Sequence, residues 1–225
     1  MKRRSSTMST VSTGQPLRSA KSRPYGVITV VGVLAVLVAI ALDTTVVHIG
    51  SEQDMRQKAF SAEAYGVAEF PKIRDNVEKR AVDAALLSQA IEADKKAAGE
   101  KYGVAGGVGP VIPVKFTGVV SERKANYNVV KVDGLAGDVT VRVQTGPALN
   151  GTDLRDATGT ISFGQFTNQI EYQNAGSAIN NEVKKQVLAN LDPANLSGKT
   201  VSVVGVFQLI NPKNWLVTPV SFEVK

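Results

Sequence analysis

An uninterrupted apolar segment near the N-terminus constrains this chain more than any other feature of its sequence. Residues 26–42 contain no charged side chain, and Thr29 carries their only hydroxyl group. A helix of this length measures about 25 Å, and its flanking residues extend it towards the thickness of a hydrocarbon core. A helix packed on a protein core would instead carry polar residues every three or four positions. The sequence therefore predicts a transmembrane helix over residues 25–47.

The chain's excess of positive charge is concentrated before the apolar segment ends. Residues 1–42 contain six basic and no acidic residues, which leaves 20 of the 26 basic residues for residues 43–225, together with all 20 acidic residues. Because positively charged flanks stay on the cytoplasmic side, we predict a disordered cytoplasmic tail over residues 1–24 and an extracytoplasmic domain after the membrane. A domain without net charge gains little from phosphate backbones, so nucleic acid is not expected as a partner.

The absence of cysteine and the single histidine exclude several kinds of functional site. The chain has no cysteine, which excludes disulfides, thiolate metal sites and a lipid-modified cysteine. Its only histidine, His48, follows the apolar segment, so neither a multi-histidine metal site nor a Ser-His-Asp triad is expected. We predict neither a metal nor a cofactor. Ala39 and Ala41 fit a signal-peptidase site, so cleavage after Ala41 is the alternative to an uncleaved signal anchor.

Residues 48–105 carry a helical pattern and are predicted to form a small helical subdomain. Apolar residues recur every three or four positions from residue 51 to Pro71, which is expected to interrupt the first helix. A second helix is predicted over residues 73–98, with a charged, solvated face. The simpler interpretation is a neck between the membrane and the next domain. The alternative is a helix pair that binds a protein partner.

From Ile112 onwards the hydrophobic period changes from about 3.6 to two, which is typical of strands. The resulting order β-β-β-α-β-β is that of the five-stranded OB barrel, which has its helix between the third and fourth strands. We therefore predict an α+β fold in which an OB-like barrel domain occupies residues 106–225, after a glycine-rich joint. The predicted strands are 112–120, 127–132, 139–145, a short one at 160–166, 200–209 and 216–224, with a helix at 175–191.

The densest polar stretch, residues 146–172, is the candidate ligand- or partner-binding site. Two interpretations remain open: a recognition surface for a polar ligand or protein, or turns in which Arg155 pairs with a carboxylate and fixes the loop. Two neighbouring carboxylates, Asp153 and Asp156, also raise the possibility of glycoside hydrolysis. The candidate residues are Asn150, Asp153, Arg155, Asp156, Asn168, Gln169 and Glu171.

The same stretch resembles a bacterial family of predicted periplasmic lipoproteins, domain of unknown function 2291. The resemblance implies a small helical domain followed by an OB-like barrel, and a role beside sugar ABC transporters, whose genes often neighbour those of members. It implies no functional residue. The chain departs from the family in lacking the lipobox cysteine. The matching elements are Gly146-Pro147, Gly151-Thr152, Leu154-Arg155-Asp156-Ala157, Ile161, Phe163, Phe166-Thr167-Asn168-Gln169-Ile170-Glu171 and Ala178-Ile179-Asn180.

Together these features predict a non-enzymatic, membrane-anchored extracytoplasmic protein that assists a sugar ABC transporter. The expected partners are the membrane and transporter components. One alternative is an envelope enzyme that acts on glycans through Asp153, Asp156 or Glu171. The other is an envelope scaffold that binds protein through residues 51–98.

Overall fold

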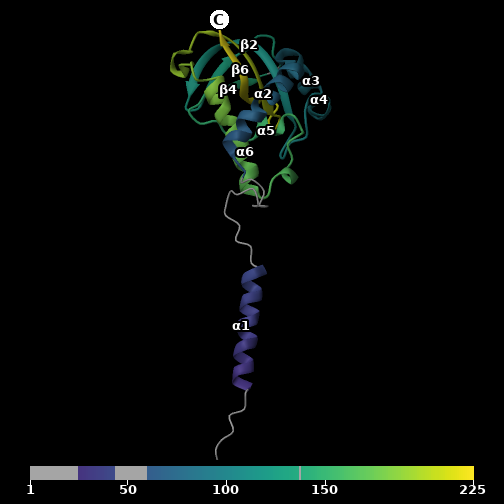
Figure 1. The fold of residues 1–225 in the computed structure, drawn as a ribbon. Helices are drawn as coiled ribbons and strands as arrows, with labels where there is room; N and C mark the ends of the chain where they lie inside the picture. The colour runs from purple at the N-terminus through teal and green to yellow at the C-terminus, as the bar shows by residue number, and fades with distance from the viewer. Residues whose placement is uncertain (1–24, 44–59, 137) are drawn as a thin grey trace, which may run out of the picture. The chain divides into compact units, whose positions relative to one another are not determined.

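The computed structural model describes residues 25–43, 60–136 and 138–225 (Figure 1). Its contacts divide the chain into two compact units, residues 1–56 and residues 57–225. Several predictions lie outside the described residues: the cytoplasmic tail, His48, the start of the first neck helix and the extension of the apolar helix to Val47.

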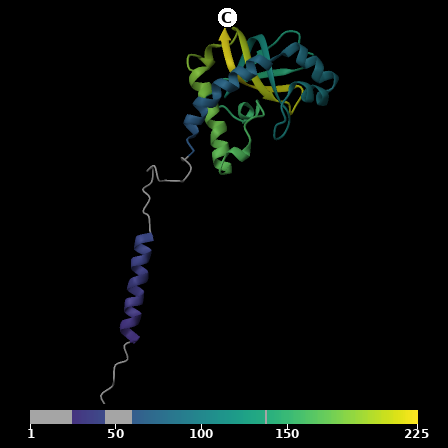
Figure 2. The same ribbon diagram turned by 45° about the vertical axis from the view of Figure 1, so that its right-hand side comes forward.

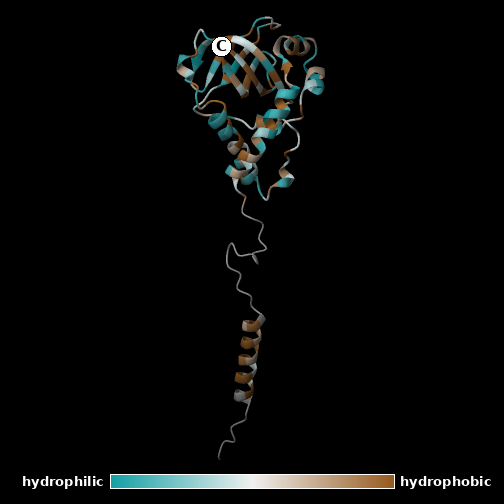
Figure 3. Cartoon of the chain, turned by 45° about the horizontal axis from the view of Figure 1, so that its top comes forward, coloured by the Kyte–Doolittle hydropathy of each residue, from teal (hydrophilic) through white to brown (hydrophobic). Residues whose placement is uncertain are grey.

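In the first unit, the apolar segment forms helix α1 (Tyr25–Asp43). Most of its residues are hydrophobic (Figure 3), and the side chains of Val30, Leu34 and Leu37 are more than half exposed. Among the described residues, no helix combines the length and the apolarity that crossing a membrane requires. The predicted transmembrane helix is therefore not supported by the structure.

The second unit is built on a closed five-stranded barrel, which confirms the predicted strand order. The sheet order is β2-β3-β4-β6-β5, and β2 also pairs with β5, so the sheet closes on itself. Strand β4 pairs with β6 in parallel, and the other barrel pairs are antiparallel. The strands are β2 (Val111–Lys124), β3 (Tyr127–Lys131), β4 (Thr140–Gln144), β5 (Thr200–Gln208) and β6 (Asn214–Val224).

The barrel interior is filled by the alternating apolar residues that predicted the strands. Phe207 and Trp215 are fully buried and stack face to face, with ring centroids 4.6 Å apart. Helices α3 (Ala84–Ala93) and α4 (Lys95–Tyr102) contribute Leu87, Ile91 and other residues to this same core. A short strand, β1 (Val82–Asp83), pairs in parallel with β2 just before α3.

A second core lies between the barrel and two longer helices, α2 (Ala62–Arg80) and α6 (Gln169–Gln186), which pack side by side (Figure 2). Gly66 permits this close contact, because a Cβ atom there would lie 2.8 Å from the carbonyl oxygen of Ala178. Barrel residues Val206 and Val220 belong to this second core, so α2 and α6 are attached to the barrel wall by buried apolar surface.

The predicted ends of the neck helices are wrong in two places. Helix α2 continues through Pro71, because Phe70, Ile73 and Val77 on both sides of it are buried in the second core. Their burial offsets a cost of about 3 kcal/mol for proline within a helix. The second predicted helix is broken instead at Asp83 and Asp94, whose side chains accept backbone hydrogen bonds at the starts of α3 and α4.

The connection between β4 and β5 also differs from its prediction. Residues 160–166 form no strand; they contain a 3-10 turn, η1 (Phe163–Gln165). Helix α6 starts at Gln169 rather than at residue 175, because Asn168 caps it. Residues 169–174 are mostly polar and show no apolar period, so the hydrophobic pattern did not predict this first part of the helix. The connection also holds α5 (Asp153–Asp156) before η1 and a second 3-10 turn, η2 (Pro193–Asn195), after α6.

Candidate functional site

The loop that follows β4 is held in place by the buried side chain of Gln144. Its amide nitrogen donates to the carbonyl of Asn150 at 2.9 Å, and its amide oxygen accepts from the backbone N–H of Asn150 at 2.8 Å. The same nitrogen donates to the hydroxyl of Thr218 on β6 at 2.8 Å. The backbone of Asn150 is therefore fixed to the barrel, while its exposed side chain remains available to a ligand.

Arg155 attaches this loop to helix α6. Its Nε and Nη2 atoms donate to the two carboxylate oxygens of Asp156 at 2.7 and 3.1 Å, and Nη1 donates to the carbonyl of Tyr172 at 3.2 Å. The guanidinium lies 3.6 Å from the centre of the Tyr172 ring, and its side chain is 8% exposed. Arg155 and Asp156 thus fix the loop, as one of the two interpretations of the polar stretch expected.

Asn168 and Glu171 form the start of α6. The side-chain oxygen of Asn168 accepts from the backbone N–H of Glu171 at 2.9 Å, and the carboxylate of Glu171 accepts from the N–H of Thr167 at the same distance. Both side chains satisfy backbone donors that the helix itself leaves unpaired. The side chains of four of the seven predicted site residues therefore make structural contacts, whereas the side chains of Asn150, Asp153 and Gln169 make no hydrogen bond to any described residue.

A polar groove of about 540 Å³ lies between the loop and one face of α6, and we call it the α6 groove. Gly176 lets the loop approach the helix, because a Cβ atom there would lie 3.3 Å from the methyl group of Thr152. The groove has no acidic residue among its described lining residues, and most of its side chains are amides or hydroxyls. The lining residues are Leu149, Asn150, Gly151, Thr152, Arg155, Gln169, Tyr172, Gln173, Ser177, Asn180, Asn181 and Lys184.

A second cavity, of about 420 Å³, lies on the other side of the loop, and we call it the barrel-mouth cavity. It shares Asn150 and Gly151 with the α6 groove, so this part of the loop lines both. Its other residues come from β4, from α5 and from the ends and connection of β5 and β6. They are Arg142, Asp153, Gln208, Ile210, Asn211, Asn214 and Leu216.

Most residues of the barrel-mouth cavity could not be predicted from the sequence. Arg142 stands in a regular V-T-V-R-V-Q alternation, where it counts as an outward-facing strand residue. Asn211 and Asn214 lie about 40 residues beyond the polar stretch, where β5 connects to β6. Only the parallel pairing of β4 with β6, which places Arg142 opposite Leu216, brings these segments together.

The three carboxylates proposed for glycan hydrolysis do not meet in one cavity. Asp153 lines the barrel-mouth cavity, Asp156 is paired with Arg155, and Glu171 binds the start of α6. Hydrolysis of a glycosidic bond uses two carboxyl groups on either side of that bond. Among the described residues, no group of three or more His, Cys, Asp or Glu side chains is arranged to hold a metal ion.

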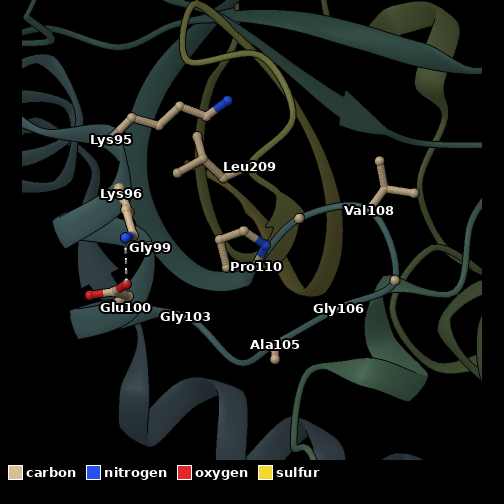
Figure 4. Close-up of a pocket in the computed structure, with 12 residues that line it drawn as sticks. Lys95, Lys96, Gly99, Glu100, Gly103, Ala105, Gly106, Val108, Pro110 and Leu209 are labelled. Atoms are coloured by element: carbon tan, nitrogen blue, oxygen red, sulfur yellow. Dashed lines mark ion pairs between the residues drawn. The ribbon is translucent and has the colours of Figure 1, made fainter.

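A further cavity, of about 730 Å³, lies elsewhere, between α4 and the glycine-rich loop of residues 103–110 (Figure 4). Pro110 and Leu209 lie at its centre, and the Lys95 ammonium group at its edge donates to the carbonyl of Ile210 at 2.6 Å. Lys96 and Glu100 form an exposed ion pair at 3.9 Å. Its lining is largely main chain and apolar side chain, which provides little chemistry for recognising a polar molecule.

Asp153 is the one candidate residue with a strongly altered acidity. Burial, with a smaller contribution from the nearby Asp156 carboxylate, raises the pKa of the Asp153 carboxyl to about 6. In the unfolded chain this group loses its proton at a lower pH, so folding becomes less favourable as pH rises from about 4 to above 6. Ionisable groups whose charged form destabilises the fold in this way are common at functional sites.

Replacing Asp153 with asparagine is expected to stabilise the protein at pH 7.5 by up to about 3 kcal/mol, because the neutral amide removes this cost. Near pH 3.5, where the carboxyl is protonated in the folded protein and mostly protonated in the unfolded chain, the difference should fall below about 0.5 kcal/mol. Urea denaturation at both values, followed by fluorescence of the buried Trp215, measures it. The exposed control Asp133→Asn should change the free energy of unfolding by less than about 0.5 kcal/mol. A destabilised Asp153→Asn variant at pH 7.5 would contradict this account.

Comparisons with known proteins agree with the fold and with the resemblance to domain of unknown function 2291. The family model described as "Predicted periplasmic lipoprotein (DUF2291)" matches residues 31–223. Among solved structures, an OB-fold protein from Thermotoga maritima has a TM-score of 0.59 and 21% identity, covering 75% of this chain and 100% of that one. This likeness shows the fold alone, and a comparison with curated proteins finds no match. Since the family model matches most of its length, the chain belongs to the DUF2291 family of predicted periplasmic lipoproteins.

Proposed function

We propose that this protein is a non-enzymatic, extracytoplasmic binding protein that associates with the membrane and assists a sugar transporter by holding a neutral, hydroxyl-rich ligand in the α6 groove. The observation that carries the proposal is a row of free polar side chains on α6. Gln169, Gln173 and Ser177 line the groove at helical spacing and make no side-chain hydrogen bond to any described residue. Such side chains both donate and accept hydrogen bonds, as sugar hydroxyls do.

The charges around the groove favour a neutral ligand. Its most buried ionic group, Arg155, is already neutralised by Asp156, and Lys184 donates to the side chain of Asn181 at 3.3 Å. No carboxylate among the described lining residues is available to bind a cation. Affinity would therefore come from many hydrogen bonds, together with the part of the Tyr172 ring that lines the groove.

Membrane association is assigned to α1. Its apolar side chains, from Ile28 to Leu42, are exposed. The chain contains no cysteine that could carry a lipid, so an apolar helix is the available means of attachment. Replacing Leu34 and Leu37 with lysine should release the chain from sedimented membranes under alkaline carbonate, and continued sedimentation would exclude α1 as the anchor.

Calorimetric titration of the full chain in mild detergent with neutral mono- and oligosaccharides tests the ligand. Replacing Gln169 and Gln173 together with alanine should weaken binding of a recognised sugar at least tenfold, because two hydrogen-bonding groups are lost. Asn174→Ala is the matched control, because Asn174 lies on α6 but does not line the groove. If no neutral sugar binds, or if the control loses as much affinity, the groove is not a sugar site.

Recovery of partners tests the link to transport separately. A tagged chain isolated in mild detergent should bring with it a permease or a substrate-binding protein of a sugar transporter. Repeated recovery of neither would remove the transporter from the proposal, whatever the outcome of the sugar titration.

A further inference from the structure

The barrel-mouth cavity contains one positive and one negative side chain that no other group neutralises. Arg142 on β4 and Asp153 at the start of α5 both line it, yet neither forms an ion pair within 4.0 Å with any described residue, nor do they pair with each other. In folded proteins, partly buried charges are usually paired or hydrogen-bonded. Two opposite, unpaired charges in one cavity therefore require a physical explanation.

Arg142 lacks an acceptor. Its Nε atom is the only fully buried side-chain nitrogen or oxygen without a hydrogen-bond partner among the described residues. Its guanidinium lies 5.1 Å from the centre of the Tyr127 ring, a contact that orients the group without accepting its N–H hydrogens. A buried donor left unpaired costs about 1–3 kcal/mol, so such groups in native proteins usually have a ligand, ion or water as partner.

Asp153 lacks a donor. It is half-buried, and its carboxylate accepts no hydrogen bond from any described residue. The nearest acidic neighbour, Asp156, is occupied by Arg155 and Thr152 and repels it. The Asp153 carboxylate is thus suited to receive a cationic donor from outside the protein.

The remaining lining residues fit a small organic molecule. Asn150, Asn211 and Asn214 supply exposed amides, while Ile210 and Leu216 supply apolar surface, and Ile210 is 56% exposed. Ile210 and Asn211 belong to the connection between β5 and β6, which corresponds to the loop between the fourth and fifth strands that OB barrels use for ligands. The cavity therefore lies on the side of the barrel where this fold commonly binds.

We propose that the barrel-mouth cavity binds a small zwitterion of the α-amino-acid type with an apolar side chain. Its carboxylate pairs with the planar guanidinium of Arg142, its ammonium group pairs with Asp153, and its side chain contacts Ile210 and Leu216. A phosphate or a simple carboxylate would neutralise Arg142 but not Asp153, and a neutral sugar would neutralise neither. This site is separate from the α6 groove, so it does not depend on sugar binding.

Titration calorimetry of the full chain in mild detergent with three matched probes tests the proposal. The probes are L-leucine, 4-methylpentanoate, which lacks the ammonium group, and 3-methylbutylamine, which lacks the carboxylate. Leucine is expected to bind at least tenfold more tightly than either analogue. Equal affinity for leucine and the carboxylate, tighter binding of inorganic phosphate or glucose, or no detectable binding of leucine would each overturn the proposal.

Two variants assign the contacts. Asp153→Asn should weaken leucine binding at least tenfold and leave the affinity for 4-methylpentanoate unchanged. Because this substitution is expected to stabilise the fold, a loss of binding cannot be attributed to unfolding. Arg142→Gln should weaken both leucine and 4-methylpentanoate, with its fold checked by Trp215 fluorescence. Lys184→Met, in the α6 groove, is the control and should leave leucine binding unchanged; retained leucine affinity in Asp153→Asn would exclude the assigned contact.

Discussion

Replacing Arg155 with methionine is expected to lower the free energy of unfolding by about 3–5 kcal/mol, the usual cost of removing one partner of a buried ion pair. Methionine fills much of the space but leaves Asp156 charged, with only Thr152 and the more distant Tyr172 hydroxyl as donors. The carbonyl of Tyr172 loses its donor as well, and the loop loses its attachment to α6. Urea denaturation followed by Trp215 fluorescence measures the loss.

Two comparisons separate the ion pair from the size of the side chain. Lys184→Met removes a cation from the same groove but breaks only a hydrogen bond to Asn181, so it should cost less than about 0.5 kcal/mol. The double replacement Arg155→Met with Asp156→Leu should be more stable than Arg155→Met alone, since no buried charge remains unpaired. A loss below about 1 kcal/mol for Arg155→Met would show that the pair does not hold the loop.

Replacing Gly118 with alanine is expected to destabilise the barrel by about 3 kcal/mol or more. A Cβ atom at Gly118 would clash with the carbonyl oxygen of Lys131 and would lie 2.7 Å from a methyl group of Val130, both on β3. Overpacking usually costs 1–3 kcal/mol, and here the backbone of a neighbouring strand must move. Alanine fits a strand better than glycine does, but this stabilises the protein by less than about 1 kcal/mol. The steric clash is larger, so the substitution is expected to lower the free energy of unfolding.

Gly107→Ala is the matched control for this prediction. Nothing lies within 4 Å of a Cβ atom at Gly107, and its backbone is not in the left-handed region. The control should be neutral or slightly stabilising, because alanine restricts the unfolded chain. Equal unfolding midpoints for the two variants would show that β2 can shift away from β3 at Gly118 at little cost.

The barrel could be predicted because its signal is local. The alternation of apolar and polar residues along β2, β4 and β5 is visible in the sequence, and it reflects the burial of one face of each strand. The boundaries of the helices could not be predicted in this way, because they depend on contacts with residues far away in the sequence. Pro71 remains within α2 only because α6, about 100 residues later, covers its neighbours. Helix α6 in turn begins with the residues QIEYQN, in which Ile170 is exposed and no apolar period is present.

The candidate site was predicted in part for the same reason. The polar stretch contains Asn150, Asp153 and Gln169, which do line cavities, together with residues whose task is structural. The sequence alone cannot distinguish cavity-lining residues from structural ones, because an Asp that caps a helix or forms an ion pair is the same residue type as an Asp that faces a cavity. The partner of Asp153 in the further inference, Arg142, is brought near it by strand pairing alone.

The order of pairing in the barrel sets a condition on how the chain acquires its structure. Strand β6 is the last of the five in sequence, yet it lies between β4 and β5 and carries Trp215 into the interior. During synthesis, some 70 further residues must therefore be made before the parallel partner of β4 is present. Until then the inner faces of four strands have no enclosing wall, and long-range pairing of this kind is slow. A chaperone that shields apolar strands during this interval should raise the yield of folded protein more than one that acts after release.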